Sequence, residues 1–564
     1  MSPRIEVNTN LNTITVTLDD GAEVRCAANT PVRDILPQHR SPEGLDYLGA
    51  LVNNDAVSLS YPVEVDSNVV LLTRGDPQGF QIYYHSVCFL LAKTVKELFP
   101  DARFAVQHSL GTGFFCSFEM NGKAGISDEQ LLSIDRQMRA TVERDVPIER
   151  RKIAFTEAVH RFEQEKQWDK YNLLRFRNPP KIATCWCENF FDLAHGPLAL
   201  STGVLTLFKL ISYPPGFVLQ IPTQDNPKEL PPFEPQPQLF QIFKEHKEWG
   251  RILGVNTVGR LNEIIASREI SEFIKIAEAF HEKKIAQIAD YIYEHRNEIK
   301  WALIAGPSSS GKTTFAKRLA VQLRVNGLRP VTISVDNYFV NREQTPLDEN
   351  GKPDFENIET VDLTLFNDHL MRLDRGEEVE LPSFNFEKGC REYHGGKLRI
   401  EPDQIVLVEG IHGLNPRLTQ SLPPTHKMRI YISALTQLNL DSNNRVSTTD
   451  NRLVRRMVRD NNFRGNSALA TLNMWPDVRR GEKTWIFPYQ QEADIAFNSA
   501  LDYELAVLKP FVEPLLAEVK PYHPQYAEAR RLLDFLSSFL GVSEHLVPPT
   551  SILREFIGHS SFRY

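Results

Sequence analysis

Residues 306–314, Gly-Pro-Ser-Ser-Ser-Gly-Lys-Thr-Thr, constrain the fold more than any other stretch of the chain. They match the phosphate-binding loop G-x-x-x-x-G-K-[ST] at every fixed position. Residues 301–305 before them form a short apolar run typical of a buried parallel strand, and residues 315–323 after them have the apolar spacing of a helix. This context favours the motif over a plain glycine–serine turn before a surface helix. The stretch therefore predicts a nucleoside triphosphate site in an α/β domain.

The loop predicts ligands for both the phosphates and a metal ion. Gly306 and Gly311 allow backbone N–H groups to turn toward phosphate oxygens, beside the positive end of the following helix. We expect Lys312 to reach the outer phosphates and the Thr313 hydroxyl to hold Mg²⁺. The predicted ATP-binding residues are Gly306, Ser308, Ser309, Ser310, Gly311, Lys312, Thr313 and Thr314.

Length, charge and cysteine usage narrow the class of protein. A chain of 564 residues has room for roughly three or four domains of the usual ~100–200 residues each. The net charge of −8 argues against non-specific nucleic-acid binding by the whole molecule, without excluding a local basic site. The six cysteines are scattered along the sequence, which is typical of reduced thiols. Residues 1–7 lack the apolar core of a signal peptide. No apolar run approaches the ~18–20 residues that a membrane span needs. We expect a cytoplasmic protein that does not bind membranes.

Two further strand-like runs end in acidic residues. Residues 331–335 precede Asp336, and residues 405–408 precede Glu409. At the carboxyl end of a parallel strand such a side chain points into the crevice where ligands bind. We expect Asp336 to accept the proton of a hydroxyl nucleophile and to help hold Mg²⁺, and Glu409 to complete the surroundings of the metal.

A basic cluster follows in residues 450–465. Its arginines have the three- and four-residue spacing that places side chains on one face of a helix. Arginines on an exposed helix usually form a solvated face, but beside a triphosphate they form a lid that neutralises charge on the transferred phosphoryl group. We predict the lid, with Arg452 and Arg456 as catalytic groups and Arg459 beside the substrate. The cluster consists of Arg452, Arg455, Arg456 and Arg459.

With these motifs in order, residues 298–510 resemble the uridine kinase and phosphoribulokinase family. The motifs are G-x-x-x-S-G-K-T-T, S-x-D-x-[YF], V-x-x-E-G-I-H and R-L-x-R-R-x-x-R-D. The resemblance implies a parallel sheet with helices on both faces and transfer of the γ-phosphate of ATP, with Mg²⁺, to a small-molecule hydroxyl. It also implies that Asp336 is the base, and that Glu359 lies where uridine kinases place an aspartate on the ribose hydroxyls.

The acceptor segment departs from the family pattern P-x-Y-x-[FY]-x-x-H-x-R. Phe384 lacks the tyrosine hydroxyl and Gly389 lacks the imidazole, while Arg391 is retained. Each lost polar reader removes typically ~1–3 kcal/mol of discrimination. Phe384 and Phe386 can still stack on a flat base. We predict a nucleoside 5′-kinase whose base preference is not simply uridine. A kinase of another hydroxyl compound, such as a sugar phosphate or a pantothenate-like acceptor, is the alternative.

The first half resembles a different family. Residues 1–75 alternate in strand fashion around a turn at residues 19–21, and they resemble the ubiquitin-like β-grasp TGS domain of threonyl-tRNA synthetases. Residues 76–221 resemble the α+β editing-type domain of the same enzymes. Residues 85–100 match its H-S-x-x-H-L-L helix, and residues 191–203 match its V-D-L-C-x-G-P-H-x-x-x-T-G segment.

The polar cluster of that editing-type domain is mostly lost. Phe89, Ala194 and Leu198 stand where the family has histidine, cysteine and histidine, so that only His85 and Asp192 remain. Apolar side chains cannot bind metal or position water. We expect a retained scaffold without deacylase chemistry. His195, one position after the lost cysteine, leaves a rebuilt site as the alternative.

The remaining segments connect or extend these domains. Residues 222–298 are predicted to be a proline-rich linker followed by connecting helices, residues 299–510 the P-loop domain, and residues 511–564 a helical extension that packs on the core or on a partner. The synthetase-like half raises a second hypothesis, an RNA- or tRNA-associated protein with a regulatory NTPase domain. Salt-resistant tRNA binding without kinase activity would favour it. A homodimer or homotetramer follows by family analogy alone.

Overall fold

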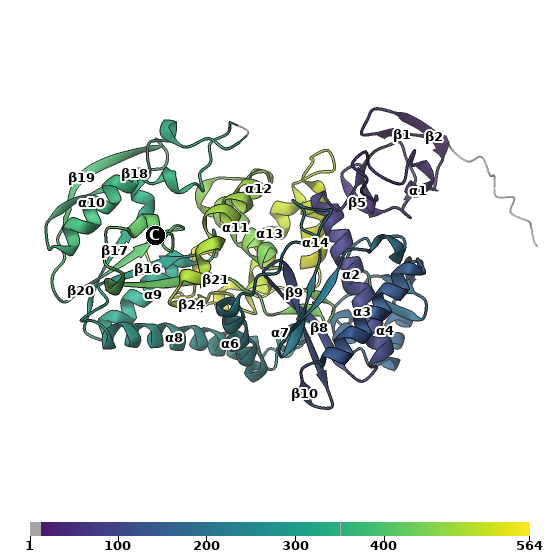
Figure 1. The fold of residues 1–564 in the computed structure, drawn as a ribbon, viewed down its shortest axis with the longest axis horizontal. Helices are drawn as coiled ribbons and strands as arrows, with labels where there is room; N and C mark the ends of the chain where they lie inside the picture. Colours follow the sequence, from purple (N-terminus) through teal and green to yellow (C-terminus); the bar gives the residue numbers. More distant parts are fainter. Residues whose placement is uncertain (1–12, 350) are drawn as a thin grey trace, which may run out of the picture.

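The computed structural model describes residues 13–349 and 351–564. The start of the predicted TGS-like domain and the expected lack of a signal peptide fall within residues 1–12, outside the described residues. Figure 1 shows a parallel sheet at one end of the molecule, the N-terminal modules at the other, and long helices between them. All six cysteines are free thiols. Among the described residues, no helix has the length and apolar content needed to cross a membrane.

The first module is a small mixed sheet with strand order β2-β1-β7-β4-β5, in which only the β1–β7 pair is parallel. Its strands alternate between buried and exposed residues because one face packs on the core and the other meets solvent. Val16, Val32 and Val63 lie in that core. The elements are β1 (Thr13–Leu18), β2 (Glu23–Ala27), β3 (Thr30–Pro31), α1 (Val32–Ile35), β4 (Gly49–Val52), β5 (Asp55–Ser58), β6 (Pro62–Val63) and β7 (Ser67–Leu72).

The second module contains two antiparallel sheets. One runs β10-β9-β15-β14 with β8 also paired to β9, and the other runs β11-β12-β13. The long helix α2 (Pro77–Leu98) is buried along most of its length. The other elements are β8 (Arg103–Leu110), β9 (Gly113–Met120), β10 (Lys123–Ala124), α3 (Asp128–Glu143), β11 (Glu149–Ala154), α4 (Phe155–Gln164), α5 (Trp168–Leu174), β12 (Lys181–Cys187), β13 (Phe190–Leu193), β14 (Lys209–Tyr213) and β15 (Gly216–Gln220).

The proline-rich stretch 222–236 forms neither helix nor strand, as its composition predicts. It is nevertheless fastened to the second module, because the Gln220 side chain donates to the Pro231 carbonyl at 2.8 Å. Three helices follow, α6 (Pro237–Leu253), α7 (Val258–Ala266) and α8 (Ile270–Glu294). Helix α8 packs along the P-loop domain, where its Glu282 binds the Arg318 guanidinium at 2.7 Å.

The P-loop domain is built on five parallel strands in the order β17-β20-β16-β21-β24. All five residues of β16 are buried, which explains its continuous apolar sequence, since helices cover both faces of such a sheet. Two hairpins project from the domain. The strands are β16 (Trp301–Ala305), β17 (Arg329–Ser334), β18 (Val379–Asn385), β19 (Cys390–Leu398), β20 (Gln404–Glu409), β21 (Lys427–Ser433), β22 (Asn439–Asp441), β23 (Asn444–Arg445) and β24 (Ile495–Asn498).

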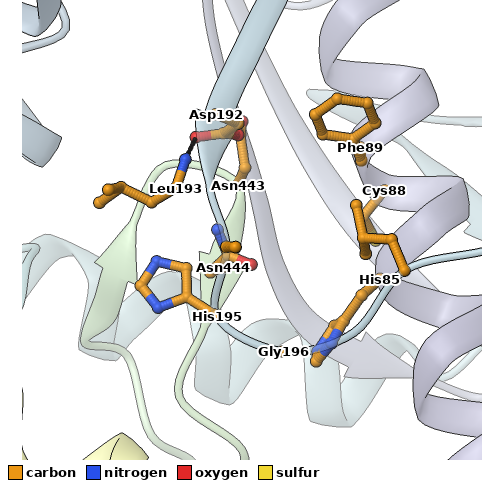
Figure 2. A pocket seen from close by; sticks show the side chains of 11 residues that line it. His85, Cys88, Phe89, Asp192, Leu193, His195, Gly196, Asn443 and Asn444 are labelled. Carbon is orange, nitrogen blue, oxygen red and sulfur yellow. Dashed lines mark hydrogen bonds between the residues drawn. The ribbon is translucent and has the colours of Figure 1, made fainter. Parts of the chain in front are cut away.

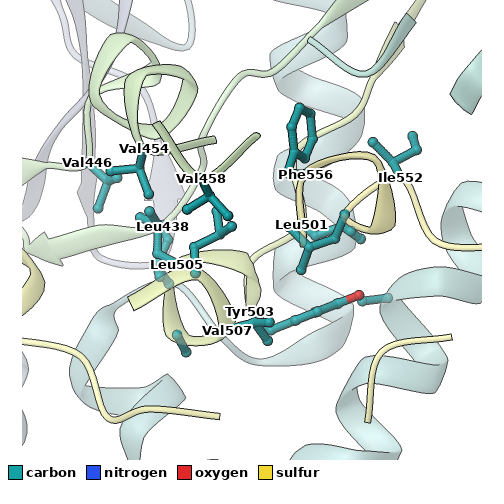
Figure 3. Close-up of a cluster of buried hydrophobic side chains, with 14 of the residues drawn as sticks. Leu438, Val446, Val454, Val458, Leu501, Tyr503, Leu505, Val507, Ile552 and Phe556 are labelled. Carbon is teal, nitrogen blue, oxygen red and sulfur yellow. The ribbon is translucent and has the colours of Figure 1, made fainter. Parts of the chain in front are cut away.

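The C-terminal extension packs on the P-loop domain. Leu532, Leu536 and Phe539 are buried in the same core as the sheet. Figure 3 shows Ile552 and Phe556 of this extension in a cluster with Val454 and Val458 of helix α11. The helices of this part are α9 (Lys312–Val325), α10 (Leu363–Asp374), α11 (Thr448–Arg464), α12 (Ala468–Trp485), α13 (Glu504–Ala517), α14 (Tyr526–Leu536) and α15 (Arg554–Ile557).

Candidate functional site

The phosphate-binding loop joins β16 to α9 at the carboxyl edge of the sheet. A Cβ on Gly306 would lie 2.2 Å from the Ile432 carbonyl oxygen, so only glycine fits there. Gly311 has φ +82°, and a Cβ on it would lie 2.5 Å from the Ile552 side chain. Both glycines are therefore required, the first by the close approach of β21 and the second by a left-handed conformation.

Two acids meet the loop from neighbouring strands. Strand β17 pairs with β20 so that Ser334 lies opposite Glu409, and Asp336 follows two residues later. The Thr313 hydroxyl donates to Glu409 Oε1 at 3.3 Å. Burial raises the pKa of Glu409 to about 7 and also raises that of Asp336, while the Lys312 ammonium opposes both shifts. Lysine, hydroxyl and the two carboxylates thus form one electrostatic group.

This group fits a magnesium ion. Mg²⁺ prefers oxygen ligands and usually keeps several waters, so that one or two carboxylates and a hydroxyl suffice. Thr313, Asp336 and Glu409 are the residues that would hold it. Within the part of the chain that the structure describes, no group of three or more His, Cys, Asp or Glu side chains is arranged so that it could hold a metal ion.

The predicted arginine lid reaches the loop. The Arg452 Nε donates to the Ser308 carbonyl at 2.9 Å, and Arg456 Nη1 donates to the Ser308 hydroxyl at 2.8 Å. Arg455 Nη1 donates to the Ser309 carbonyl at 3.3 Å. Helix α11 therefore lies across the phosphate loop. The catalytic roles of its arginines stay predictions.

The four arginines are not equivalent. Arg455 is fully buried and bound to Glu504, with Nε at 3.0 Å, and its Nη2 donates to the Ser499 carbonyl at 2.9 Å. Arg459 is half-buried and bound to Asp460 at 3.0 Å. Burial of Arg455 against a buried carboxylate indicates a structural role, which the spacing of the arginines in the sequence did not separate from the others.

Two carboxylates that the sequence analysis did not identify accept hydrogen bonds from N–H and hydroxyl groups of the phosphate-binding loop. The Ser308 N–H donates to Glu482 Oε1 at 3.1 Å, and Arg452 also binds this fully buried carboxylate. The Thr314 N–H and hydroxyl donate to Glu555 at 3.1 Å and 2.7 Å. The Tyr564 hydroxyl also contacts the Thr314 hydroxyl, and Figure 1 shows the C-terminus beside the sheet. These donors are the groups that bind phosphate in such loops.

A Glu482→Gln variant is therefore expected to bind ADP about tenfold more tightly, because the glutamine oxygen accepts from the Ser308 N–H without the negative charge that makes the present hydrogen bond worth roughly 1.5–3 kcal/mol. Isothermal titration calorimetry measures the change. The matched control is Glu492→Gln, since Glu492 is exposed and paired with Arg429 at the surface. Equal ADP affinity in wild type and Glu482→Gln would contradict the competition.

The role of Glu359 at the acceptor hydroxyls stays a prediction. Glu359 is about 50% exposed and pairs with Arg417. Glu356, three residues earlier, packs against Gly481 of helix α12. Burial and the neighbouring Glu482 raise the pKa of Glu356 to about 7, opposed by Arg456 and Lys312. Glu356 is thus the acid of this segment that faces the lid and the loop.

Phe384 and Phe386 of the acceptor hairpin β18–β19 form an aromatic cluster with Phe339, which follows β17. Phe339 packs edge-on against Phe384 and Phe386, with ring centroids 5.6 Å and 6.4 Å away. Phe384 is half-buried, while Phe386 is 59% exposed. Both Arg391 Nη atoms donate to Asp362 Oδ2 at 3.0 Å, so Arg391 is already engaged.

The missing histidine at position 389 has a structural reason. Gly389 has φ +67°, and a Cβ there would lie 2.8–3.0 Å from the Arg342 side chain. Arg342 in turn donates to the Phe386 carbonyl at 2.7 Å. Arg342 therefore occupies the space that a side chain at position 389 would need.

The retained Asp192 of the editing-type cluster and the nearby His195 both have close partners. Asp192 binds Lys170 at 3.1 Å, both nearly fully buried, and His195 Nε2 lies 2.7 Å from Asp441 Oδ2. Phe89 and Leu198 line the adjoining cavity with apolar surface. His85 lines the same cavity. The retained acid is thus already paired with a lysine, and the lack of deacylase chemistry stays a prediction.

Comparison with known proteins gives a match for each half of the chain. Residues 303–506 match the model of the Phosphoribulokinase / Uridine kinase family. Over 200 residues the chain is 30% identical with a threonine–tRNA ligase from Desulforamulus reducens, covering 35% of this chain and 31% of that protein. A threonine–tRNA ligase from Janthinobacterium sp. is 31% identical over 199 residues, with the same two shares. The chain spans about a third of the length of these curated relatives.

Two solved chains are similar to the P-loop domain. A possible uridine kinase from Bacillus stearothermophilus is 16% identical with a TM-score of 0.25, and the match covers 37% of this chain and 97% of that one. The D-glycerate 3-kinase from Cryptococcus neoformans is 14% identical with a TM-score of 0.22, and the match covers 45% of this chain and 87% of that one.

The predicted resemblance to the uridine kinase and phosphoribulokinase family in the C-terminal half, and to threonyl-tRNA synthetase in the N-terminal half, is confirmed. So is the predicted fold class, an α/β P-loop domain with a parallel sheet preceded by a β-grasp and an α+β module. The family match supports a P-loop phosphotransferase. The domain boundaries and site roles stay predictions.

Proposed function

We propose that the protein transfers the γ-phosphate of ATP to the 5′-hydroxyl of a nucleoside and that its base preference is not restricted to uridine. The observation that carries the proposal is the meeting of Lys312, Asp336 and Glu409 at the carboxyl ends of three adjacent parallel strands. Ligands of open α/β sheets bind at that edge. A triphosphate on the loop would present its terminal phosphoryl group to these side chains.

In the proposed reaction Asp336 accepts the proton of the acceptor hydroxyl as its oxygen attacks the γ-phosphorus. Lys312 neutralises the outer phosphates, and Arg456 lies against the loop where negative charge develops. Mg²⁺, when bound, supplies charge neutralisation at the phosphate oxygens. Because there is little covalent chemistry for the protein to perform, these side chains act mainly by position and charge.

The base would bind at the β18–β19 hairpin. Phe384 and Phe386 offer ring faces and edges, which accept any flat base. Arg342 lies where the family has a histidine reader, so it supplies N–H donors from a different position. These groups favour discrimination by stacking more than by a fixed pattern of hydrogen bonds.

An acceptor screen tests the proposal. With ATP and Mg²⁺ we expect at least one purine nucleoside to be phosphorylated with kcat/KM within about tenfold of uridine, because a lost reader gives up roughly a factor of ten or more in discrimination. The panel is uridine, cytidine, adenosine, guanosine and inosine, with product formation followed by chromatography. Efficient use of uridine and cytidine alone would contradict the relaxed preference. Phosphorylation of none of them would reject a nucleoside acceptor and favour another hydroxyl compound.

A further inference from the structure

The hairpin β22–β23 of the P-loop domain is seated against the N-terminal half. Asn443 Nδ2 donates to Asp192 Oδ2 at 2.6 Å, and Asp441 binds His195. The Arg445 guanidinium lies 5.1 Å from the centre of the Phe114 ring. Further bonds join Val106 N to Ser442 O (2.9 Å), Asn439 Nδ2 to Val106 O (2.9 Å) and Ser442 N to Asp169 Oδ2 (2.7 Å). The hairpin is thus held by the N-terminal half at many points.

A cavity lies at this junction, and neither half forms it alone. Figure 2 shows its walls: His85 and Cys88 on helix α2, the segment that follows Asp192, and Asn443 and Asn444 on the hairpin. The cavity measures about 20 Å³, which holds about one water. An occupant larger than this that enters fully presses on the walls, and the hairpin is the wall that comes from the other half of the chain.

The polar groups around the cavity define the ligand that it would take. The two carboxylates beside the cavity already have partners, since Lys170 binds Asp192 at 3.1 Å and His195 Nε2 lies 2.7 Å from Asp441 Oδ2. Burial lowers the pKa of His85 to about 4, so this imidazole is neutral at neutral pH. The amide N–H groups of Asn443 and Asn444 donate to carboxylates, which leaves their carbonyl oxygens as acceptors. An uncharged ligand that donates hydrogen bonds matches these groups.

The hairpin is continuous with the lid. Helix α11 begins at Thr448, three residues after β23 ends at Arg445, and it carries the arginines that contact the phosphate loop. Leu438 and Val446, which flank the hairpin, lie with Val454 of α11 in one buried cluster (Figure 3). Because close-packed elements move together, a shift of the hairpin carries α11 with it.

We propose that this cavity is an effector site for a small uncharged compound bearing hydroxyl groups, whose entry displaces the hairpin, loosens α11 and opens the phosphate loop to nucleotide. The inference rests on the proposed function only in that its test measures the affinity for a nucleotide, ADP. Displacement of α11 breaks the Arg452 contacts to the Ser308 carbonyl and to Glu482, the carboxylate that occupies the Ser308 N–H. Effector and nucleotide therefore favour the same open state, and each raises the affinity of the other by the same factor.

The test uses glycerol and erythritol as uncharged probes, with lactate and ethanolamine as charged probes of similar size. Thermal unfolding of the full chain reports probe binding, and calorimetry measures the ADP dissociation constant with and without each probe. We expect the uncharged probes to stabilise the protein and to tighten ADP binding by about fivefold or more, the usual lower range of such coupling. Lactate and ethanolamine are expected to do neither.

Two variants locate the effect. His85→Leu removes the neutral imidazole, and Ala194→Leu fills the cavity from its other wall. Both are expected to abolish the stabilisation by glycerol and erythritol while ADP binding without probe stays unchanged. The proposal would be overturned if neither uncharged probe stabilised the wild type, or if the probes stabilised the two variants as much as they stabilise the wild type. It would also be overturned if a probe bound without changing the affinity for ADP. If ADP did not bind at all, this would count against the proposed function. The thermal shifts would still show whether the probes bind in the cavity.

Discussion

An Asp336→Asn variant is expected to lose turnover by about a thousandfold while binding ADP almost as tightly as the wild type, since a positioned general base contributes typically 10²–10⁴-fold. The asparagine keeps the size of the side chain but cannot accept the proton of the attacking hydroxyl. The effect should appear in kcat, because the carboxylate acts in the transition state more than in nucleotide binding. Steady-state kinetics with the preferred nucleoside and calorimetry with ADP measure the two quantities.

The chain offers a matched control for this change. Asp403 precedes β20 at the opposite, amino edge of the sheet, where its exposed carboxylate pairs with Arg329. Asp403→Asn makes the same chemical change in the same sheet and should leave kcat unaltered, since exposed ion pairs contribute only ~0–1 kcal/mol. Unchanged turnover in Asp336→Asn would remove this residue from the base role. A parallel loss in both variants would indicate damage to the sheet.

The donor side of the site could be predicted because its signals are local. The apolar run 301–305 coincides with β16, and Glu409 ends β20 as expected, since burial on both faces of a parallel sheet leaves a continuous apolar sequence. The fixed positions of the glycines in the loop motif also imply a particular backbone conformation at each of them. The structure adds a positive φ at Gly311 and a close approach at Gly306, both of which the motif already implied.

The carboxylates that surround the loop could not be predicted in this way. Glu482 and Glu555 are separated from Ser308 and Thr314 by 174 and 241 residues, and their contacts depend on how distant helices pack. An acid at a surface-like position in the sequence gives no signal that it will be buried against an arginine. The same limit explains Glu356, since only the packing of α12 determines that this acid packs against Gly481.

The helical spacing in the sequence predicted one common role for the lid arginines, whereas their contacts in the structure distinguish Arg455 from Arg456. Arg455 lies on the side of α11 that faces Glu504, and Arg456, one residue later, reaches the Ser308 hydroxyl. Successive helix residues point about 100° apart, so neighbours in the sequence can serve different surfaces. Structural and catalytic roles are therefore expected to separate between two adjacent arginines.

The Arg455→Met variant is accordingly expected to lower the free energy of unfolding by about 3–5 kcal/mol, because Glu504 would be left as an uncompensated buried charge. Arg456→Met should instead lower kcat by about a hundredfold or more, since it removes charge beside the transferring phosphoryl group, with a smaller effect on unfolding. Urea denaturation and steady-state kinetics on both variants provide the comparison.

A double variant isolates the cause of the stability loss. Arg455→Met combined with Glu504→Gln removes both buried charges, and replacing a whole buried pair costs far less than breaking it. The double variant should therefore recover at least half of the lost unfolding free energy, while Arg456→Met with Glu504→Gln should show no recovery. If Arg455→Met and Arg456→Met lower stability equally, or if the double variant is no more stable than Arg455→Met alone, then Arg455 does not hold α11 through Glu504 and belongs with the phosphate-facing arginines.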